Sequence, residues 1–335
     1  MLIIEKPGLQ TSVQDLGRPG FQQYGVVAGG AMDPYSHRVA NLLAGNSETC
    51  ATIEAALAGP SIRFEMDSLI ALAGGDLSPG IDGEPVPMWR PVAVKAGAVL
   101  TFGKPVSGCR VYIAVAGGID VPEVLGSRST YAKARIGGLE GRCLEKGDTL
   151  QTGKPSILAK HWAATALSKA GERQFCAADW SVSDELVPRY GNQAEIRMMK
   201  GPQHRWFDEE SRSLFFSGTF TVSSESDRMG YRLKGDALRL SEPRELLSEG
   251  VVAGAVQVPS GGSPILLMAD RQTTGGYPKI GQAASVDLPL VAQLQPGAQL
   301  RFKEVSVDEA QQLLIQRKKR LAELKLAVEL KMKGV

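Results

Sequence analysis

Alternating and continuous apolar runs along the chain predict a protein built mainly from β-strands. Residues 61–66 alternate polar and apolar positions, which is typical of a strand with one buried face. Longer apolar runs at 69–73, 110–116 and 263–269 end at Gly-Gly pairs or at Asp270 and predict fully buried strands. The pattern therefore favours many short strands separated by tight turns.

Helical signals are fewer and lie at well-marked positions. Asp33 followed by Pro34 predicts the start of a helix that ends near Gly45, and a short helical run spans residues 161–170. Ser306 and Glu309 form a capping box that opens a long C-terminal helix with a leucine stripe. We interpret this helix as packed on its own protein with a solvated basic face; docking of a partner is the alternative.

A short motif recurs about 200 residues apart. Gly, Ala, Leu and Phe occupy equivalent positions in segments 96–102 and 296–302. The recurrence indicates either a generic turn followed by a strand or two related β-barrel halves. On the second interpretation, residues 1–155 form a first barrel half, 156–190 a connecting segment, 191–303 a second barrel half and 304–335 the C-terminal helix.

Composition supports many turns and argues against several classes of partner. The 335 residues include 38 glycines and 19 prolines, while 43% are hydrophobic, which is enough for a real core. The net charge of +2 is far from the strongly basic balance of a nucleic-acid binder. No apolar run is long enough to span a bilayer, and the first residues lack the features of a signal peptide. We therefore expect a cytoplasmic protein that binds neither nucleic acid nor membrane.

Cysteine and histidine usage gives no support to a metal site. The four cysteines are widely spaced without a CxxC pair, and the three histidines stand far apart. The sequence also lacks GxSxG, HExxH and phosphate-loop motifs. We expect no protein-bound structural metal and no standard covalent or dinucleotide chemistry.

Polar, glycine-rich loops are the strongest candidates for function. They lie at residues 11–20, 126–131, 223–232 and 269–280, and the last directly follows a buried strand. A structural loop rarely needs such varied polar groups, because each buried one must find a partner. We predict that this last loop binds a ligand through Asp270, Arg271, Gln272, Thr273, Thr274, Tyr277 and Lys279. Structural pairing of Asp15 with Arg18, and of Asp227 with Arg228, is the alternative for two of the other loops.

These loops resemble a known family. The segments that carry the resemblance are Gln14-Asp15-Leu16-Gly17-Arg18, Gly29-Gly30-Ala31-Met32-Asp33, Val115-Ala116-Gly117-Gly118-Ile119, Gly126-Ser127-Arg128-Ser129-Thr130-Tyr131, Ser226-Asp227-Arg228-Met229-Gly230-Tyr231-Arg232 and the loop from Asp270 to Lys279. Together they are similar to the family of 5-oxoprolinase C subunits and KipA proteins, which also includes the second half of the carboxyltransferase region of urea carboxylase. The match runs in order from Ile4 to about Phe302 and leaves out the terminal helix.

The resemblance implies a fold, a reaction and partners. It implies two cyclophilin-like β-barrel halves, and ATP-dependent opening of 5-oxo-L-proline to L-glutamate. The implied partners are a KipI-like B subunit and the A subunit of 5-oxoprolinase. In the KipA branch it also implies antagonism of KipI, an inhibitor of a sporulation histidine kinase. Two alternatives stay open: a carboxyltransferase acting on urea or a related amide, and a purely regulatory KipI-binding protein. This chain carries no biotin attachment site.

The resemblance also gives the candidate residues their roles. A phosphorylated lactam would concentrate negative charge, which preorganised cations can stabilise. The cations in question are Arg18, Arg128, Arg271 and Lys279. The carboxylates that could hold the Mg²⁺ of ATP or activate water are Asp15, Asp33 and Asp270. The residues expected to bind substrate are Gln272, Thr273, Thr274, Tyr277, Asp227 and Arg228. No single catalytic base can be chosen among the carboxylates.

Overall fold

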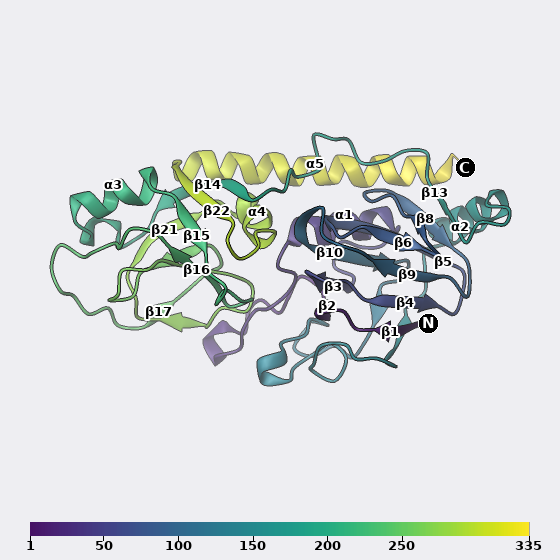
Figure 1. Ribbon diagram of the computed structural model, residues 1–335, viewed down its shortest axis with the longest axis horizontal. Coiled ribbons are helices and arrows are strands. Elements are labelled where there is room, and N and C mark those ends of the chain that lie inside the picture. Colours follow the sequence, from purple (N-terminus) through teal and green to yellow (C-terminus); the bar gives the residue numbers. More distant parts are fainter. Residues whose placement is uncertain (335) are drawn as a thin grey trace. The chain divides into compact units, whose positions relative to one another are not determined.

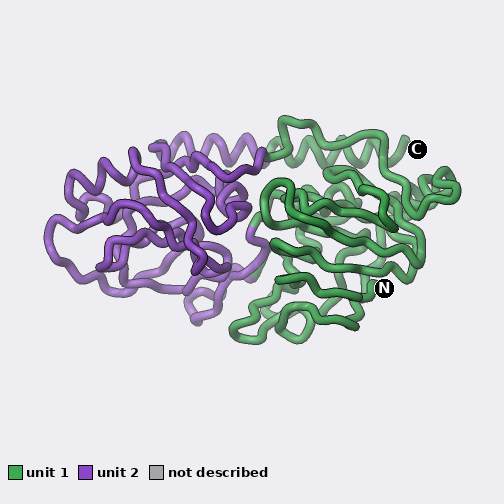
Figure 2. Tube along the Cα trace, viewed as in Figure 1, with its two compact units in different colours: residues 1–17, 33–188, 319–335 green, residues 18–32, 189–318 purple. Residues whose placement is uncertain are grey.

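The computed structural model describes residues 1–334 and divides into two compact units. Unit 1 comprises residues 1–17, 33–188 and 319–335, and unit 2 comprises residues 18–32 and 189–318 (Figure 2). Strands β1 to β13 belong to unit 1, and β14 to β22 belong to unit 2 (Figure 1). The expectation of a mainly β protein with a few helices is confirmed.

Unit 1 contains two β-sheets. The first has the order β11 (Ile119–Asp120), β12 (Thr149–Thr152), β1 (Leu2–Lys6), β4 (Ser61–Phe64), β9 (Val99–Phe102), β6 (Pro79–Ile81) and β7 (Glu84–Pro85). The second has the order β13 (Phe175–Ala177), β8 (Pro91–Val94), β5 (Ser68–Asp76), β10 (Ser107–Val115), β3 (Thr52–Ala56) and β2 (Gln10–Gln14). The first half, which we expected to be a barrel, is thus a pair of sheets.

One apolar core is shared by both sheets of unit 1. It contains Ile62 and Phe64 from the first sheet and Leu72 and Val111 from the second, all fully buried. Helix α1 (Pro34–Leu43) packs on β5 and β10. The central strands of the second sheet, β5 and β10, are buried at consecutive positions instead of at alternate ones, as the sequence indicated.

Unit 2 is a closed barrel with a small ribbon beside it. The barrel has the order β14 (Gln193–Lys200), β21 (Lys279–Ala283), β18 (Ala255–Gln257), β19 (Ile265–Leu267), β16 (Gly230–Lys234), β15 (Phe220–Val222) and β22 (Gln299–Glu304). A separate two-stranded ribbon pairs β17 (Glu249–Gly250) with β20 (Thr274–Gly275). The barrel core includes the tilted aromatic rings of Phe215, Phe220 and Phe302. A barrel in the second half is therefore confirmed.

The helices after Asp33 and Ser306 begin where these capping residues predict, whereas the helix expected over 161–170 begins earlier, at Ile157, because Ser156 caps it. Asp33 caps α1 by accepting a hydrogen bond from the Ser36 amide at 2.9 Å. The capping box of Ser306 and Glu309 is formed at the start of α5 (Val307–Lys333). The remaining helices are α2 (Ile157–Lys169), α3 (Glu209–Ser217) and α4 (Leu288–Ala292), with short 3-10 turns at Gln22–Tyr24, Ala132–Ala134, His204–Trp206 and Ser285–Asp287.

The recurring motif adopts the same local structure at both places. Gly97 and Gly297 have φ angles of +87° and +88°, which a residue with a side chain rarely adopts. The Gly97 amide donates to the Phe64 carbonyl, and the Gly297 amide donates to the Val222 carbonyl. In each case the following alanine carbonyl accepts a hydrogen bond back from that same residue. The repeat therefore marks an identical turn into a strand in the two units.

The boundaries of the two units differ from those of the segments expected from the sequence. Residues 156–190, expected to be a connection, contribute α2 and β13 to unit 1 because β13 pairs with β8. Residues 18–32 count with unit 2, and α5 changes from unit 2 to unit 1 between Lys318 and Lys319. None of the helices in the described part of the chain combines the length and apolar character that crossing a bilayer requires.

Candidate functional site

The candidate residues are divided between the two units. Unit 1 holds Asp15, Asp33 and Arg128. Unit 2 holds Arg18, Asp227, Arg228, Asp270, Arg271, Gln272, Thr273, Thr274, Tyr277 and Lys279. Most of the candidates, including the whole of the loop from Asp270 to Lys279, therefore belong to the barrel unit.

Asp15 is surrounded by hydrogen-bond donors of the second polar loop. Its Oδ1 accepts from the hydroxyls of Ser127 at 2.7 Å and Ser129 at 2.5 Å, and from the Gly17 amide at 2.8 Å. Its Oδ2 accepts from the Arg128 amide at 2.6 Å. Asp15 is 7% exposed. With its oxygens occupied in this way, the carboxylate is placed to hold the loop and not to take a proton from a substrate.

The Arg128 side chain points toward carboxylates near the surface. Its guanidinium lies 3.3 Å from Glu123 and 3.8 Å from Asp120, and its Nε donates to the Val121 carbonyl. The arginine thus forms ion pairs with both neighbours while its backbone amide binds Asp15. The backbone and the side chain of Arg128 therefore have different partners.

Asp33 is a buried helix cap. It is fully buried, and its Oδ2 accepts from the Ser36 hydroxyl at 2.7 Å in addition to the amide contact described above. Its own amide donates to the Tyr112 hydroxyl at 2.7 Å. These contacts give Asp33 a structural role at the start of α1, which is the role that its position before Pro34 predicts.

A buried polar row next to Asp33 is not evident from the sequence. Glu54 of β3 accepts from the Tyr112 hydroxyl of β10 at 2.7 Å, and Arg110 lies 4.0 Å from the same carboxylate. Burial is the main cause that raises the pKa of Tyr112 well above its ordinary value. Tyr112 and Glu54 are cross-strand partners, so they share one face of the sheet. The one sign of this row in the sequence is Glu54, a single carboxylate within the otherwise uncharged strand 52–56.

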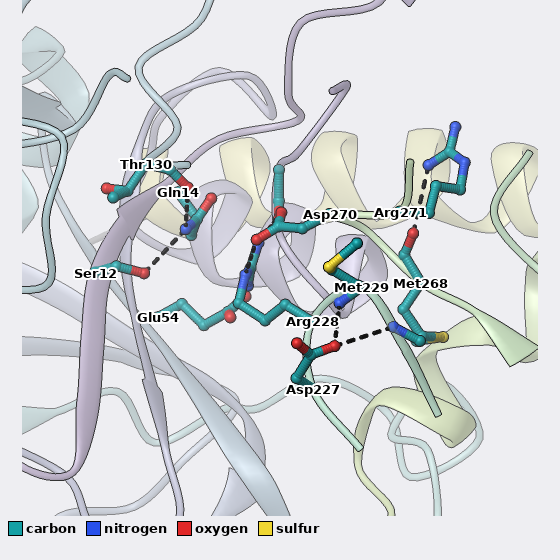
Figure 3. A network of polar contacts seen from close by, with 12 residues as sticks. Ser12, Gln14, Glu54, Thr130, Asp227, Arg228, Met229, Met268, Asp270 and Arg271 are labelled. Atoms are coloured by element: carbon teal, nitrogen blue, oxygen red, sulfur yellow. Dashed lines mark hydrogen bonds and ion pairs between the residues drawn. The ribbon is translucent and has the colours of Figure 1, made fainter. Parts of the chain in front are cut away.

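Unit 2 contains a buried ion pair beside a pair of glycines. The Arg228 guanidinium bonds both oxygens of Asp270, at 2.8 and 3.1 Å, and also donates to the Gly30 carbonyl at 2.6 Å (Figure 3). Both side chains are about nine-tenths buried. A bidentate pair of this kind fixes the geometry of both residues.

Arg18 approaches the same glycines. A β-carbon on Gly29 would lie 3.3 Å from an Arg18 Nη and 3.8 Å from Asp270 Oδ1, and Gly29 has a φ angle of +63°. Arg18 itself is 1% exposed. The glycine therefore lets two charged side chains of unit 2 approach its backbone closely. Arg18, Asp270 and Arg228, predicted from separate loops, are gathered around residues 29–30.

Asp227 stabilises the turn that carries Arg228. Its Oδ1 accepts from the amides of Met229 at 2.8 Å and Gly230 at 3.3 Å (Figure 3). This side-chain contact with amides two and three residues ahead is typical of a turn-forming aspartate. Its contacts thus orient the Arg228 loop.

Arg271 has only carbonyl oxygens as hydrogen-bond partners in the structure of residues 1–334. Its Nε and Nη1 donate to the carbonyls of Val251 and Met268, each at 3.4 Å. The side chain is half-buried, and burial lowers the pKa of its guanidinium. A partly buried cation with two long, neutral contacts is suited to accept an anionic ligand.

Lys279 is a buried cation in contact with the ribbon. Its ammonium forms a short hydrogen bond with Glu249 of β17, and Gln203 donates to the same carboxylate oxygen at 3.0 Å. The Lys279 contact is the main cause that lowers the pKa of Glu249. Lys279 is 6% exposed. Glu249 and Gln203 could not be identified from the sequence, because neither stands in a recognisable motif.

The rest of the loop is divided between the ribbon and an open pocket. Gln272 donates to Gln257 at 3.1 Å, and the Thr273 carbonyl accepts from Gln22 at 2.7 Å. Thr274 lies in β20 and is exposed. Tyr277 is 49% exposed and lines a pocket of about 790 Å³. The other walls of that pocket include Phe207, Leu240, Val258, Arg239 and Arg244.

The carboxylates do not form a metal cage within a unit. No group of three or more His, Cys, Asp or Glu residues in the described chain is arranged to hold a metal ion. The four cysteines have free thiols; Cys109 is buried and the others are half-buried.

Sequence comparison places the chain among carboxyltransferase domains. Residues 24–304 match the family model for the carboxyltransferase domain, subdomain A and B. The chain is 42% identical over 311 residues to the 5-oxoprolinase C subunit of Escherichia coli, covering 92% of this chain and 93% of the relative. It is 37% identical over 304 residues to the 5-oxoprolinase C subunit of Haemophilus influenzae, covering 91% of each.

Solved structures show the same fold within larger proteins. The urea amidolyase of Kluyveromyces lactis superposes with a TM-score of 0.86 at 31% identity, covering 96% of this chain and 20% of that one. The urea carboxylase of the same yeast also gives a TM-score of 0.86, at 30% identity, with 96% and 29% covered. The family resemblance inferred from the polar loops is confirmed, and the chain belongs to the carboxyltransferase domain family, subdomains A and B, together with the 5-oxoprolinase C subunits.

Proposed function

We propose that this chain is the C subunit of a multi-subunit 5-oxoprolinase, which opens 5-oxo-L-proline to L-glutamate at the expense of ATP. The observation that carries the proposal is the 42% identity to the E. coli C subunit over nearly the whole of both chains. The partners would be a KipI-like B subunit and the A subunit of 5-oxoprolinase. Mg²⁺ would enter bound to the phosphates of ATP, as is usual for this cation.

The proposed chemistry uses ATP to activate a poor electrophile. The lactam oxygen attacks the γ-phosphorus and ADP leaves, and water then adds to the ring carbon that bears the phosphorylated oxygen. The C–N bond breaks with proton transfer to the nitrogen, which leaves the side-chain carboxyl as an acyl phosphate. A second water hydrolyses this acyl phosphate to glutamate and phosphate. Negative charge builds up on the transferred phosphoryl group and on the ring oxygen, and preorganised cations would stabilise it.

Unit 2 supplies the groups best suited to this task. Arg271 interacts with the charge of Asp270 but donates hydrogen bonds only to carbonyl oxygens, at 3.4 Å, so a phosphate or carboxylate oxygen could replace these acceptors. Lys279 is paired with the half-exposed Glu249, which a ligand could displace. Arg228 is paired with the buried Asp270, so we assign it to holding the loop that begins at Asp270 and not to binding a ligand.

The test is ATP-dependent glutamate release by the chain mixed with the A and B subunits. Arg271→Ala should lower the rate at least about tenfold while the complex still assembles, because one charge-assisted contact is worth about 1.5–3 kcal/mol. Arg232→Ala is the matched control, since Arg232 is an exposed arginine of the same barrel. An unchanged rate for Arg271→Ala in an intact complex would remove Arg271 from the site but leave the function standing.

A second candidate function is carboxyl transfer to urea or a related amide. It is favoured by the likeness to the two yeast enzymes, although the chain spans only about a fifth of the K. lactis urea amidolyase. Bicarbonate- and biotin-dependent carboxylation of urea, supported by a separate biotin carrier, would favour this function. Binding of a KipI-like protein without glutamate release in any mixture would instead favour the purely regulatory role, including KipI antagonism.

A further inference from the structure

A buried amide on the barrel has a donor group without a partner. Gln257 of β18 is 1% exposed, and its Nε2 has no hydrogen-bond partner within residues 1–334. Its Oε1 accepts from Gln272 Nε2 at 3.1 Å, which sets the orientation of the amide. Buried polar groups are nearly always hydrogen-bonded, and each exception needs an explanation.

The free donor lies beside a cation. Gln257 is the cross-strand partner of Lys279, at a point where the register between β18 and β21 shifts. Directly opposite side chains project from the same face of a sheet. The Gln257 amide and the Lys279 ammonium are therefore two neighbouring donors on one face of the barrel wall.

The ribbon covers these donors without bonding Gln257. A β-carbon on Gly275 would lie only 2.3 Å from Gln257 Nε2, so the glycine of β20 rests directly against the amide. The ribbon is held by two contacts from Gln22, to the carbonyls of Val251 and Thr273, and by the bond between Lys279 and Glu249. Its strands have two residues each and are mostly exposed, which is typical of a segment that opens locally.

We propose that Gln257 is a further ligand-binding residue, and that the ribbon of β17 and β20 is the cover of its site. When the ribbon moves aside, Gln257 Nε2 and the Lys279 ammonium bind the carbonyl oxygen of a small cyclic amide. Two donors on one oxygen also complement the negative charge that this oxygen acquires during activation. The assignment of a cyclic amide rests on the proposed function.

The first test separates ligand binding from a structural role. Gln257→Met removes the donor, together with the oxygen that accepts from Gln272, and keeps the side-chain length. Gln282→Met is the control because Gln282 Nε2 already donates to the Ala253 carbonyl at 2.8 Å. Calorimetric titration of the assembled complex compares 5-oxo-L-proline with L-proline, which has the same ring and carboxylate but no ring carbonyl.

The two variants should behave in opposite ways. Gln257→Met should weaken 5-oxo-L-proline binding by about tenfold, the ratio expected for one lost hydrogen bond, and leave L-proline binding unchanged. Its melting temperature should change little, because replacing an unsatisfied donor with an apolar group offsets the lost hydrogen bond from the half-buried Gln272. Gln282→Met should melt at a lower temperature and keep the wild-type preference between the two ligands.

A second measurement follows the ribbon directly in the wild-type complex. Addition of 5-oxo-L-proline should change the hydrogen exchange of the amides at residues 249–251 and 273–276, and addition of L-proline should not. Unchanged exchange at saturating 5-oxo-L-proline would overturn the ribbon as a cover.

The outcomes distinguish this inference from the proposed function. If the complex releases glutamate but Gln257→Met keeps its affinity for 5-oxo-L-proline, the inference fails and the function stands. If no glutamate is released and the variant selectively loses 5-oxo-L-proline binding, the inference stands and the function fails. Equal losses for both ligands, or no wild-type binding of 5-oxo-L-proline, would overturn the inference.

Discussion

Two carboxylates of unit 1 and two of unit 2 are stabilised in different ways. In unit 1, Asp15 and Asp33 accept hydrogen bonds from backbone amides and serine hydroxyls. In unit 2, Asp270 and Glu249 are paired with the cations Arg228 and Lys279. Asp15 and Asp270 come from polar loops that look alike in the sequence.

The difference shows which carboxylates can respond to a ligand. The amides and serine hydroxyls that bind Asp15 and Asp33 are held in place by the fold and do not exchange for a ligand. These two carboxylates therefore hold a loop and a helix end in place. A cation paired with a carboxylate can exchange that partner for a substrate anion when the partner is near solvent. By this criterion Glu249, which is 45% exposed, is exchangeable, and Asp270, at 9%, is not.

The largest expected effect comes from breaking the buried pair of unit 2. Asp270→Asn leaves the Arg228 charge buried without its carboxylate, which should lower the free energy of unfolding by about 3–5 kcal/mol. Urea denaturation followed by circular dichroism measures this change. Glu225→Gln is the control, because Glu225 is exposed and lies 3.9 Å from Arg232. A loss below about 1 kcal/mol for Asp270→Asn would show that the pair is not structurally important.

A buried histidine of unit 1, His37, should make the stability of the protein depend on pH. Burial lowers the pKa of His37 from 6.5 to about 4, so the unfolded chain binds an extra proton between these values. The contribution of a neutral His37 is complete above pH 6.5 and is lost as the pH falls toward 4, by about 3 kcal/mol in total. His37→Gln should reduce the slope of unfolding free energy against pH in that window, and an unchanged slope would refute the assignment.

A smaller loss is expected from Asp15. Asp15→Asn replaces one carboxylate oxygen with an amide group that meets a donor, so at least one charge-assisted hydrogen bond is lost. The free energy of unfolding should fall by about 2 kcal/mol, and amides at residues 127–130 should exchange faster. Asp120→Asn is the matched control, because Asp120 is exposed and lies 3.8 Å from Arg128. Equal effects of the two substitutions would show that the hydrogen bonds of Asp15 do not stabilise its loop.

The smallest effect on stability is expected at Glu249. Glu249→Gln keeps an oxygen that can accept from Lys279, and the side chain is already half-exposed, so stability should change by less than about 1 kcal/mol. The ribbon should nevertheless open more often, which faster hydrogen exchange at residues 249–251 would detect. A large loss of stability would mean that Glu249, like Asp270, has a fixed structural partner.

Local structure could be predicted well from the sequence. Asp33 before Pro34 and Ser306 before Glu309 each marked a helix start, because capping depends on neighbouring residues alone. The continuous apolar runs marked strands buried on both faces. The pairing of strands could not be predicted in this way, so the two sheets of unit 1 and the transfer of residues 18–32 to unit 2 appeared only in the structure.

The candidate site shows the same division between local and distant information. The loop from Asp270 to Lys279 was identified by its unusual variety of polar groups. Its partners Gln203, Glu249 and Gln257 lie elsewhere in the chain, and only folding brings them to Lys279 and Gln272. Likewise Glu54 and Tyr112 are single polar residues in apolar strands, and their pairing depends on the register of β3 and β10.

The order of the chain through the two units has a consequence for synthesis. Unit 1 contains the first residue of the chain and also the last part of α5, where Leu324, Val328 and Met332 are buried. These residues follow all of unit 2 in the chain, so unit 1 cannot be complete until the whole of unit 2 has been made. Unit 2 likewise needs residues 18–32 from the beginning of the chain. A single truncation of the chain therefore cannot give either unit alone. Each unit would need its separate coding segments to be joined in a new order or with linkers.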